Sequence, residues 1–350
     1  MPESVRILLT CVGGLGVPKL VEYLRRIRDL DLTIVGVDAN PNAVGASFVD
    51  EFHRVPFATA PEYSEALLDV CRKGEVGLIV PLSDEEALRL SKDRDVFAEH
   101  HYSVLCSPYE ATRTASNKYT FLCRLQDRGL PTPKFYRPSS RAQMDAALRE
   151  LEYPAKKVVF KPLHGHGSRG FRLIDPNFDE WDHILSSKKE TLLSLPRLLS
   201  LLDRREEYPP FLLMEYLEGE TYSVEVLMQD GRPKYIIPQR KLAPRHGSLE
   251  VGVVERNPDI ERAVPPILGA FDFRYLVNID MSYQGHSRQG AVLPYDLNAR
   301  PSAVVSVTAA AGCFLLEEAI FQALGVPRPI KTFGGVKMMR FWDEKFIAAG

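Results

Sequence analysis

Short apolar runs alternate with amphipathic runs along the first hundred residues of the chain. Strands are predicted where the runs are short and continuously apolar, at Val5–Cys11, Thr33–Asp38, Gly77–Pro81 and Ser103–Cys106. Helices are predicted where apolar residues recur at helical spacing, at Pro18–Asp29, Pro61–Lys73 and Asp84–Lys92. Buried strands that alternate with helices are typical of βαβ units, so this part of the chain predicts a parallel sheet.

The middle of the chain predicts one helix and one hairpin. The helix covers Ser116–Gly129, with Ser116 as its N-cap. The hairpin pairs Lys157–Pro162 with Phe171–Ile174 through the glycine-rich run Gly165–Gly170. Because glycine lets backbone N–H groups come close to a ligand, this tip suits a cover over phosphate groups.

A polar, leucine-rich stretch at 176–210 predicts a helical insertion before the next set of strands. The later elements are predicted as three strands, a helix and a closing strand, at Phe211–Tyr216, Thr221–Met228, Tyr235–Pro238, Thr308–Leu324 and Lys337–Phe346. The run 239–246 is predicted as a basic loop that carries Arg240, Arg245 and His246. Such a loop is either a clamp for an acidic substrate or phosphate, or a solvated surface.

Two alternating segments near the C-terminus predict another hairpin, and its polar face is chemically unusual. Asn278 and Asp280 share one face of the first segment, and Asp296, Asn298 and Arg300 share one face of the second. Pairing across the polar loop between them brings Asp280 close to Asp296. Carboxylate and amide oxygens suit a hard divalent cation, and a guanidinium suits phosphate or carboxylate, so this face predicts a magnesium–nucleotide site.

The composition limits the classes of function. The chain has 350 residues, enough for two or three domains, with 26% charged and 45% hydrophobic residues. A formal net charge of −2 gives no general attraction to nucleic acid or to an anionic membrane. No run is apolar enough to cross a bilayer, and the N-terminus lacks a signal-peptide layout. We therefore expect neither nucleic acid nor a membrane as a partner. The five cysteines are scattered, so we expect reduced thiols in the cytoplasm.

A glycine-rich turn after the first predicted strand allows a different interpretation. The run Gly13-Gly14-Leu15-Gly16 opens a helix, and Asp38 ends the second strand, as in dinucleotide-binding domains. The full fingerprint needs a further glycine inside the helix, which this sequence lacks. A tight structural turn is therefore favoured, and a nicotinamide-dependent oxidoreductase remains the alternative.

Three charged residues occupy positions that local structure does not require. Lys118 lies in the first turn of its helix, where the helix dipole disfavours a cation, so it either faces an anion or is a surface lysine. Lys161 ends the strand that enters the glycine-rich tip. Glu215 ends an apolar strand, where it either receives an adenine amino group or is an ordinary strand terminus.

These pieces, in this order, resemble the ATP-grasp superfamily. The nearest branch resembles the ATP-binding halves of the large subunit of carbamoyl phosphate synthase and related carboxylate–amine ligases, over 1–327. The motifs that carry the resemblance are Val35–Pro41, Val80–Glu86, Asn117-Lys118, Gly129–Pro133, Phe160–Pro162, Gly165–Gly170, Met214–Glu220 and Asp296–Pro301.

The resemblance implies an α/β fold with α+β character in its C-terminal part. A Rossmann-like N-terminal domain is expected at 1–112. A helical linker and a lid subdomain are expected at 113–215, including the insertion 176–210. An antiparallel catalytic subdomain with a tail strand is expected at 216–350.

The resemblance also implies ATP with Mg²⁺, or Mn²⁺, and a set of site residues. The nucleotide contacts would be Lys118, Lys161, Gly165, Gly167, Ser168, Gly170, Glu215, Tyr216, Leu217 and Glu220, with Thr221 as the alternative to Glu220 at the ribose. One or two metal ions would be held by Asp280, Asp296 and Asn298. The catalytic residues would be Lys161 and Arg300. The substrate would contact Arg240, Arg245, His246, Arg300 and Ser302.

The implied activity is ADP-forming ligation of a small carboxylate to a small amine through an acyl phosphate, in an enzyme that could form a homodimer. The sequence departs from the family in carrying Asp296, where glutamate is usual, and Asp280, where glutamate or glutamine is common. A single ATP-grasp unit does not imply carbamoyl phosphate synthesis. A non-catalytic ATP-binding sensor and the oxidoreductase named above are the competing interpretations.

Overall fold

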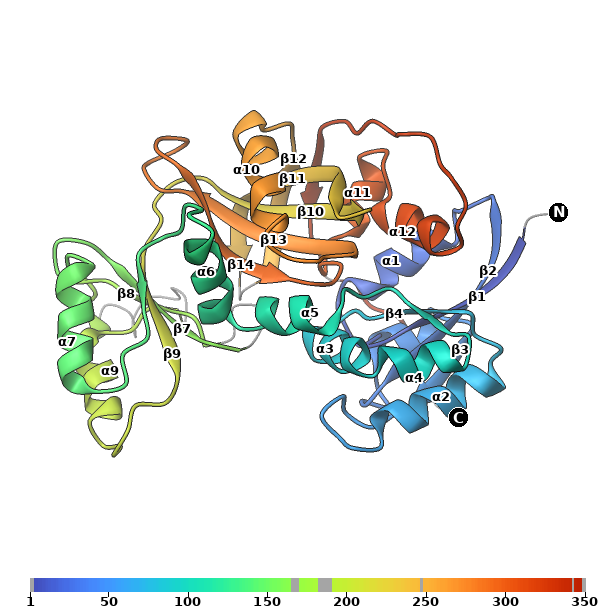
Figure 1. Cartoon of the computed structure of the whole chain (residues 1–350), viewed down its shortest axis with the longest axis horizontal. Helices are drawn as coiled ribbons and strands as arrows, with labels where there is room; N and C mark the ends of the chain where they lie inside the picture. Colours follow the sequence, from blue (N-terminus) through green and yellow to red (C-terminus); the bar gives the residue numbers. More distant parts are fainter. Residues whose placement is uncertain (1–2, 165–169, 182–190, 246–247, 342, 348–350) are drawn as a thin grey trace.

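The computed structural model describes residues 3–164, 170–181, 191–245, 248–341 and 343–347. These residues form three sheets, joined through helices as shown in Figure 1. No helix in the described ranges is long and apolar enough to cross a membrane.

The N-terminal sheet is parallel, as the alternating pattern predicts. Its strand order is β3-β2-β1-β4-β5. The strands are β1 Glu3–Leu9, β2 Leu30–Asp38, β3 Glu51–Arg54, β4 Leu78–Val80 and β5 Ser103–Val104. The helices of this region are α1 Val17–Leu24, η1 Val44–Ser47, α2 Tyr63–Lys73, α3 Asp84–Lys92 and α4 Arg94–Glu99. Strand β3 and helix α4 were not predicted, because both are too short to show a period of their own.

A four-stranded antiparallel sheet forms the lobe at the left of Figure 1. Its order is β6-β9-β7-β8, with β6 Phe135–Tyr136, β7 Val158–Pro162, β8 Arg172–Ile174 and β9 Phe211–Glu215. The predicted hairpin of β7 and β8 is therefore confirmed. Helices α7 Arg141–Glu150 and α9 Leu195–Leu202 pack on this sheet around Met144, Leu198 and Phe211.

A six-stranded antiparallel sheet forms the centre of the molecule, in the order β14-β13-β10-β11-β12-β15. The strands are β10 Thr221–Gln229, β11 Arg232–Arg245, β12 Ser248–Val254, β13 Tyr275–Tyr283, β14 Val292–Asn298 and β15 Val336–Met339. One face packs on α10 Pro258–Leu268 through Val224, Val226 and Ile260. Helices α5 Tyr109–Ala115 and α6 Lys118–Asp127 cross from the N-terminal sheet toward the four-stranded sheet and pass beside β14.

The N-terminal and six-stranded sheets share one hydrophobic core. Helices α11 Ser306–Ala310 and α12 Leu315–Ala323 lie between them. Ile7 of β1, Leu227 of β10 and Leu316 of α12 belong to the same buried cluster. This shared core fixes the carboxyl ends of the N-terminal strands relative to the central sheet.

Four sequence predictions are corrected by the structure. Residues 239–245 continue strand β11 and pair with β12, so no basic loop begins at Gln239. Asn117, and not Ser116, caps α6, because its side chain accepts the free N–H groups of Tyr119 and Thr120.

The other two corrections concern the C-terminal part. The predicted helix Thr308–Leu324 is two helices, broken at Gly312, whose φ of 95° is incompatible with an α-helix. The predicted closing strand is shorter than expected: β15 covers Val336–Met339, which pairs with β12, and one further backbone hydrogen bond joins Arg340 N–H to the carbonyl of Glu250. The three-part division of the chain stays a prediction.

Candidate functional site

The predicted hairpin exists, and its polar face lies on the six-stranded sheet. Asp280 of β13 is directly opposite Asp296 of β14, and Asn278 is opposite Asn298. The prediction that pairing brings Asp280 close to Asp296 is therefore confirmed. We call this surface, with the polar residues beside it on β10 and β11, the polar face.

A β-bulge shapes this hairpin at Tyr295. The register shifts between Asp280 and Met281, so that Met281 pairs with Pro294 and Tyr295 is the extra residue. A bulge breaks the strict alternation of side chains. Tyr295 and Asp296 are neighbours in sequence, yet both contact lysines of the polar face.

Three lysines from different elements converge on the polar face. Lys118 Nζ lies 3.2 Å from Asp296 Oδ1, and Lys241 Nζ of β11 lies 2.7 Å from Asp280 Oδ2. Lys161 Nζ of β7 lies 4.4 Å from the centre of the Tyr295 ring. Two carboxylates are therefore faced by three ammonium groups, an arrangement that suits a polyanion such as a triphosphate.

The first turn of α6 holds Lys118 against the end of β7. Lys118 N–H donates to the carbonyl of Leu163 at 3.1 Å, and the side chain of Asn117 lies 3.3 Å from His164 Nε2. Lys118 is buried, so it is not a surface lysine. The sequence allowed Lys118 to be a surface lysine or to face an anion. The structure shows the second arrangement, with Lys118 facing the carboxylate of Asp296.

Burial acts differently on two of these lysines. Lys161 is buried, and desolvation lowers its pKa to about 8, although Asp296 works against this shift. Desolvation also lowers the pKa of Lys241, but the carboxylate of Asp280 and the oxygen of Tyr295 more than compensate, so the net pKa is raised. Lys241 is compensated by the negative charge of Asp280, whereas Lys161 is not fully compensated. A bound phosphate would supply the negative charge that Lys161 lacks.

Arg300 ties the polar face to the N-terminal domain. Its guanidinium is buried, and Nη2 lies 2.7 Å from Asp84 Oδ2 at the start of α3. Asp84 raises the pKa of Arg300 despite the cost of burial. A pocket between α3, the junction of α5 and α6, His164 and β14 contains Asp84, Lys118, Asp296 and Asn298 among its walls.

Glu225 of β10 carries a buried carboxyl group that is influenced by the charge of Arg300. Asn278 Nδ2 donates to its Oε1 at 3.0 Å, and Ser302 faces the carboxyl group with its hydroxyl and its backbone N–H. Desolvation raises the pKa of Glu225 to about 7 against the opposing effects of Ser302 and Arg300. Ser302, a predicted substrate residue, thus faces Glu225, as does the charge of Arg300.

The predicted adenine hinge lies at the end of β9. Glu215 Oε1 accepts the backbone N–H of Lys134 at 2.7 Å, and Oε2 accepts from Gln284 at 3.4 Å. Leu217 is buried and Tyr216 is partly exposed. The carboxylate of Glu215 therefore already has hydrogen-bond donors, and the backbone at 216–217 is the free part of the hinge.

Glu220 and Arg240 lie together, away from the polar face. Arg240 pairs with Tyr222 in the sheet, on the opposite side from Lys241. Arg240 Nη1 is 3.3 Å from Glu220, and Arg288 Nε is 2.7 Å from Glu220. Desolvation would raise the pKa of Glu220, but these partners lower it overall.

Thr221, the alternative to Glu220, is opposite Ser282 and on the same side as Asp280. The structure therefore brings Thr221 to the polar face and separates Arg240 from Arg300 and Ser302.

Several predicted residues lie outside the described structure. These are Gly165, Gly167, Ser168 and His246. For Arg245, the backbone is described as the end of β11. Gly170 is described, with a φ of 76°, and a Cβ atom there would meet Pro162 Cγ at 2.5 Å. Only glycine fits this close approach at the base of the hairpin tip.

The ligands available to a metal are two carboxylates and one carboxamide. In the described ranges no group of three or more His, Cys, Asp or Glu side chains is arranged to hold a metal ion. Asp280 Oδ1 is buried and has no hydrogen-bond partner within the part of the chain that is described. The donor set of Asp280, Asp296 and Asn298 is all oxygen, so it fits Mg²⁺ or Mn²⁺ with phosphate oxygens completing the coordination.

Four residues of the site were not singled out from the sequence. They are Lys241, Tyr295, Glu225 and His164. Lys241 was assigned to a loop, and the bulge hid Tyr295 on the apolar side of a strict alternation. Glu225 did interrupt the apolar run of β10, and that signal could have revealed it.

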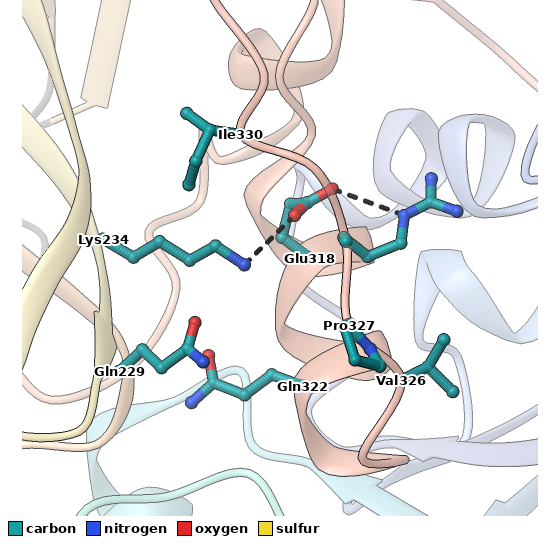
Figure 2. A pocket seen from close by; sticks show the side chains of 8 residues that line it. Gln229, Lys234, Glu318, Gln322, Val326, Pro327 and Ile330 are labelled. Atoms are coloured by element: carbon teal, nitrogen blue, oxygen red, sulfur yellow. Dashed lines mark ion pairs between the residues drawn. The ribbon is translucent and has the colours of Figure 1, made fainter.

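A second cavity, of about 230 Å³, lies beside α12, away from the polar face. Figure 2 shows Lys234 and Glu318 pointing toward each other across it, at 3.6 Å. Glu318 is fully buried and lies 3.0 Å from Lys331. Arg328, in the same wall, lies 2.9 Å from Glu317 and 2.6 Å from Asp29. We call these residues the α12 cluster.

Comparison with known proteins separates the two halves of the chain. Residues 7–105 match the family model "PylC-like, N-terminal domain". Residues 207–341 match the model "ATP-grasp in the biosynthetic pathway with Ter operon". No curated protein matches the chain significantly.

Solved structures resemble the chain over nearly its full length. The N5-carboxyaminoimidazole synthetase of Staphylococcus aureus, complexed with ADP, has a TM-score of 0.72 at 16% identity, over 97% of this chain and 83% of that one. The L-amino acid ligase of Bacillus licheniformis has a TM-score of 0.63 at 14% identity, over 93% and 75%.

The biotin carboxylase domain of the Hydrogenobacter thermophilus 2-oxoglutarate carboxylase, a dimer with MgADP and bicarbonate, has a TM-score of 0.66 at 14% identity, over 95% and 73%. The sheet arrangement and these structural similarities agree that the chain has the ATP-grasp fold, and residues 207–341 match an ATP-grasp family model.

Proposed function

We propose that this protein is an ATP-dependent ligase that joins a carboxylate to an amine through an acyl phosphate and releases ADP and phosphate. The observation that carries the proposal is the convergence of Lys118, Lys161 and Lys241 on the carboxylates of Asp280 and Asp296. Lysines from three elements around two acids form a site for a triphosphate and its metal ion. The solved ligases and carboxylases of the same fold support this interpretation.

The nucleotide would lie between the four-stranded sheet and the polar face. Lys118 and Lys161 would hold phosphate oxygens, and Lys241 would be a third cation next to them. Adenine would bind at the backbone of 216–217, and Thr221 is the better candidate for the ribose, because Glu220 is engaged by arginines. The residues Gly165, Gly167, Ser168 and Gly170 would cover the phosphates.

Asp280, Asp296 and Asn298 would hold Mg²⁺, or Mn²⁺, at the phosphate end of this cleft. A bound metal neutralises the charge on the phosphates and orients them for transfer. Lys118 pairs with Asp296, and Lys241 pairs with Asp280. Each lysine is therefore placed to turn from an aspartate to a phosphate oxygen when nucleotide binds.

Arg300 would stabilise the substrate carboxylate as its oxygen attacks the γ-phosphorus and ADP leaves. An amine then attacks the carbonyl carbon of the acyl phosphate, and phosphate leaves. Asp84 holds the Arg300 guanidinium in place from the N-terminal domain, so the acceptor would enter between α3 and β14. Arg240, which lies on the other side of the sheet, is not part of this pocket.

The oxidoreductase alternative loses its support in the glycine-rich turn. Gly13 N–H donates to Asp38 Oδ2 at 2.7 Å, so the carboxylate that would bind a ribose closes the turn instead. A Cβ atom at Gly16 would collide with the carbonyl oxygen of Ala303. The glycines therefore allow close packing against the loop that carries Ser302.

The proposal includes a cytoplasmic enzyme, since all five cysteines are free thiols, and a homodimer as its assembly. The identity of the carboxylate and the amine follows from a screen. ADP release is measured with the twenty common L-amino acids and a set of dicarboxylates, each with and without an amine.

The double variant Asp296→Asn, Asn298→Ala tests the site directly. ADP release should fall by at least ~10³-fold, because the metal loses two ligands. The melting temperature should stay close to that of the parent, because both side chains lie on a polar face. Full activity in this variant, or absence of any carboxylate-dependent ADP release in the parent, would refute the proposed function.

A further inference from the structure

Glu225 is a buried acid that the mechanism above does not use. Its side chain is on the polar face, and the residue is only 1% exposed. Oε1 accepts from Asn278, whereas Oε2 is buried and makes no hydrogen bond of normal geometry within the described ranges. A buried carboxylate oxygen without a donor is costly, so the position calls for an explanation.

The groups that face Glu225 come from three strands and one loop. Ser223 of β10 and Asn278 of β13 are neutral and share a hydrogen bond of 2.9 Å. Asp280 of β13 disfavours the ionised form of Glu225, and Arg300 after β14 favours it. Ser302 is the remaining polar neighbour. Burial raises the pKa of Glu225 by more than the hydrogen bonds of Ser302 lower it, so the pKa is about 7.

Ser302 connects Glu225 to the acceptor side of the site. Its Oγ accepts the backbone N–H of Val304 at 3.1 Å, which leaves the hydroxyl proton to be donated. The carboxyl group of Glu225 is the acceptor that this hydroxyl faces. Ser302 also follows Arg300 by two residues, and both residues act on the carboxyl group of Glu225.

We propose that Glu225, acting through the Ser302 hydroxyl, accepts the proton that the amine loses when it attacks the acyl phosphate. This inference rests on the proposed function. As the amine nitrogen bonds to the carbonyl carbon, the bond from that carbon to the phosphate oxygen breaks, and phosphate leaves with the electron pair. The N–H proton passes to Ser302 Oγ while Ser302 passes its own proton to Glu225.

The cycle closes when Glu225 releases this proton to solvent before the next turnover. In this proposal Glu225 does not contact the substrate. It acts through Ser302, whose hydroxyl proton it orients and accepts, and is therefore a positioning residue. A carboxyl group with a pKa near the working pH is suited to this exchange. Transfer of the γ-phosphoryl group to the carboxylate involves no amine and does not need Glu225.

Hydroxylamine separates the two half-reactions. It traps the acyl phosphate as a hydroxamate, and its low basicity lets the adduct lose a proton to water. L-alanine as the amine is strongly basic and needs a proton acceptor. The carboxylate that gives the largest ADP release in the amino-acid and dicarboxylate screen is used with both nucleophiles.

Glu225→Gln should lower amide formation with L-alanine by at least ~10²-fold and change hydroxamate formation little. Ser302→Ala should show the same selectivity. Ser223→Ala, which alters a neighbouring hydroxyl, is the matched control and should show no selectivity. After division by the fraction of unprotonated L-alanine at each pH, amide formation in the parent should fall as the pH drops through about 7, and Glu225→Gln should lose this dependence.

Two outcomes would overturn the inference. One is an equal loss of amide and hydroxamate in Glu225→Gln, as expected of a residue that only supports Arg300. The other is an unchanged pH profile in that variant. Absence of ADP release and hydroxamate from the parent would instead contradict the proposed ligase function, so the two failures are distinguishable.

Discussion

The polar face beside β14 and the α12 cluster both place buried or partly buried lysines near carboxylates, and the pKa of the lysine shifts in opposite directions in the two places. Lys331 of the α12 cluster lies near both Glu317 and Glu318, at 3.2 and 3.0 Å. Burial lowers the pKa of Lys331, but the two carboxylates raise it by more than burial lowers it, so the net pKa is above the ordinary value. The α12 cluster thus satisfies its own charges.

Lys161 of the polar face is in the reverse position. Within the described structure it makes no ion pair within 4 Å, and its Nζ lies 4.4 Å from the centre of the Tyr295 ring. Its pKa falls to about 8 because burial prevails over Asp296. The partly buried Lys331 is satisfied by carboxylates of the fold, whereas the pKa of the buried Lys161 fits the proposal that an anion binds beside it.

The largest effect should come from Lys161→Met. Removing this ammonium should reduce carboxylate-dependent ADP release by roughly 10²–10³-fold, because a buried cation at the phosphates has no replacement. Stability should not fall, since the variant no longer buries a poorly compensated charge. Kinetics and thermal melting are measured together, with Lys331→Met as the matched control. A control that loses as much ADP release as Lys161→Met would abolish the distinction between the clusters.

A smaller effect, on stability alone, is expected from Glu318→Gln. This change leaves Lys234, Arg328 and Lys331 with one carboxylate fewer in a buried setting. The free energy of unfolding should fall by about 3–5 kcal/mol, as measured by urea denaturation. The ADP release per folded molecule should be unchanged. Glu317→Gln, at a more exposed position, provides the comparison and should cost less.

The smallest effect should be a dependence of stability on pH that belongs to Lys161. In the folded protein its pKa is about 8, against an ordinary value of 10.5, so the unfolded chain binds the proton more tightly. Stability should therefore rise between pH 8 and 10.5, by up to about 3 kcal/mol. Below pH 8 both states carry the proton and the burial cost is present in full. Urea denaturation across this range should show the rise in the parent and not in Lys161→Met; a rise of equal size in both would assign it to another group.

Periodicity predicted those parts of the fold that contain long or regular runs. Helix α3 has the predicted bounds Asp84–Lys92, and the strands of the N-terminal sheet follow from their continuous apolar character. Short elements such as β6, with two residues, carry too little pattern to be recognised. Strand β12 was not predicted. The basic residues at the end of its partner β11 are typical of a loop, so no pairing strand was expected after them.

The site could be predicted only as far as local spacing determines it. Asp280 and Asp296 were found because one hairpin contains both, and its register follows from alternation. Lys241 could not be placed, because its contact with Asp280 depends on how β11 joins a sheet whose order differs from the order in sequence. Arg240 was assigned to the substrate because charge composition does not show which side of a strand a residue occupies.

The contact between Asp84 and Arg300 spans 216 positions in the sequence. During synthesis the strands of the N-terminal sheet are made long before Arg300, but part of their core, including Leu227 and Leu316, comes from later in the chain. Lys118 is also made early, but its partner Asp296 is not. Under the proposed function, a chain truncated before Asp280 would lack all three proposed metal ligands, and we expect it to release no ADP.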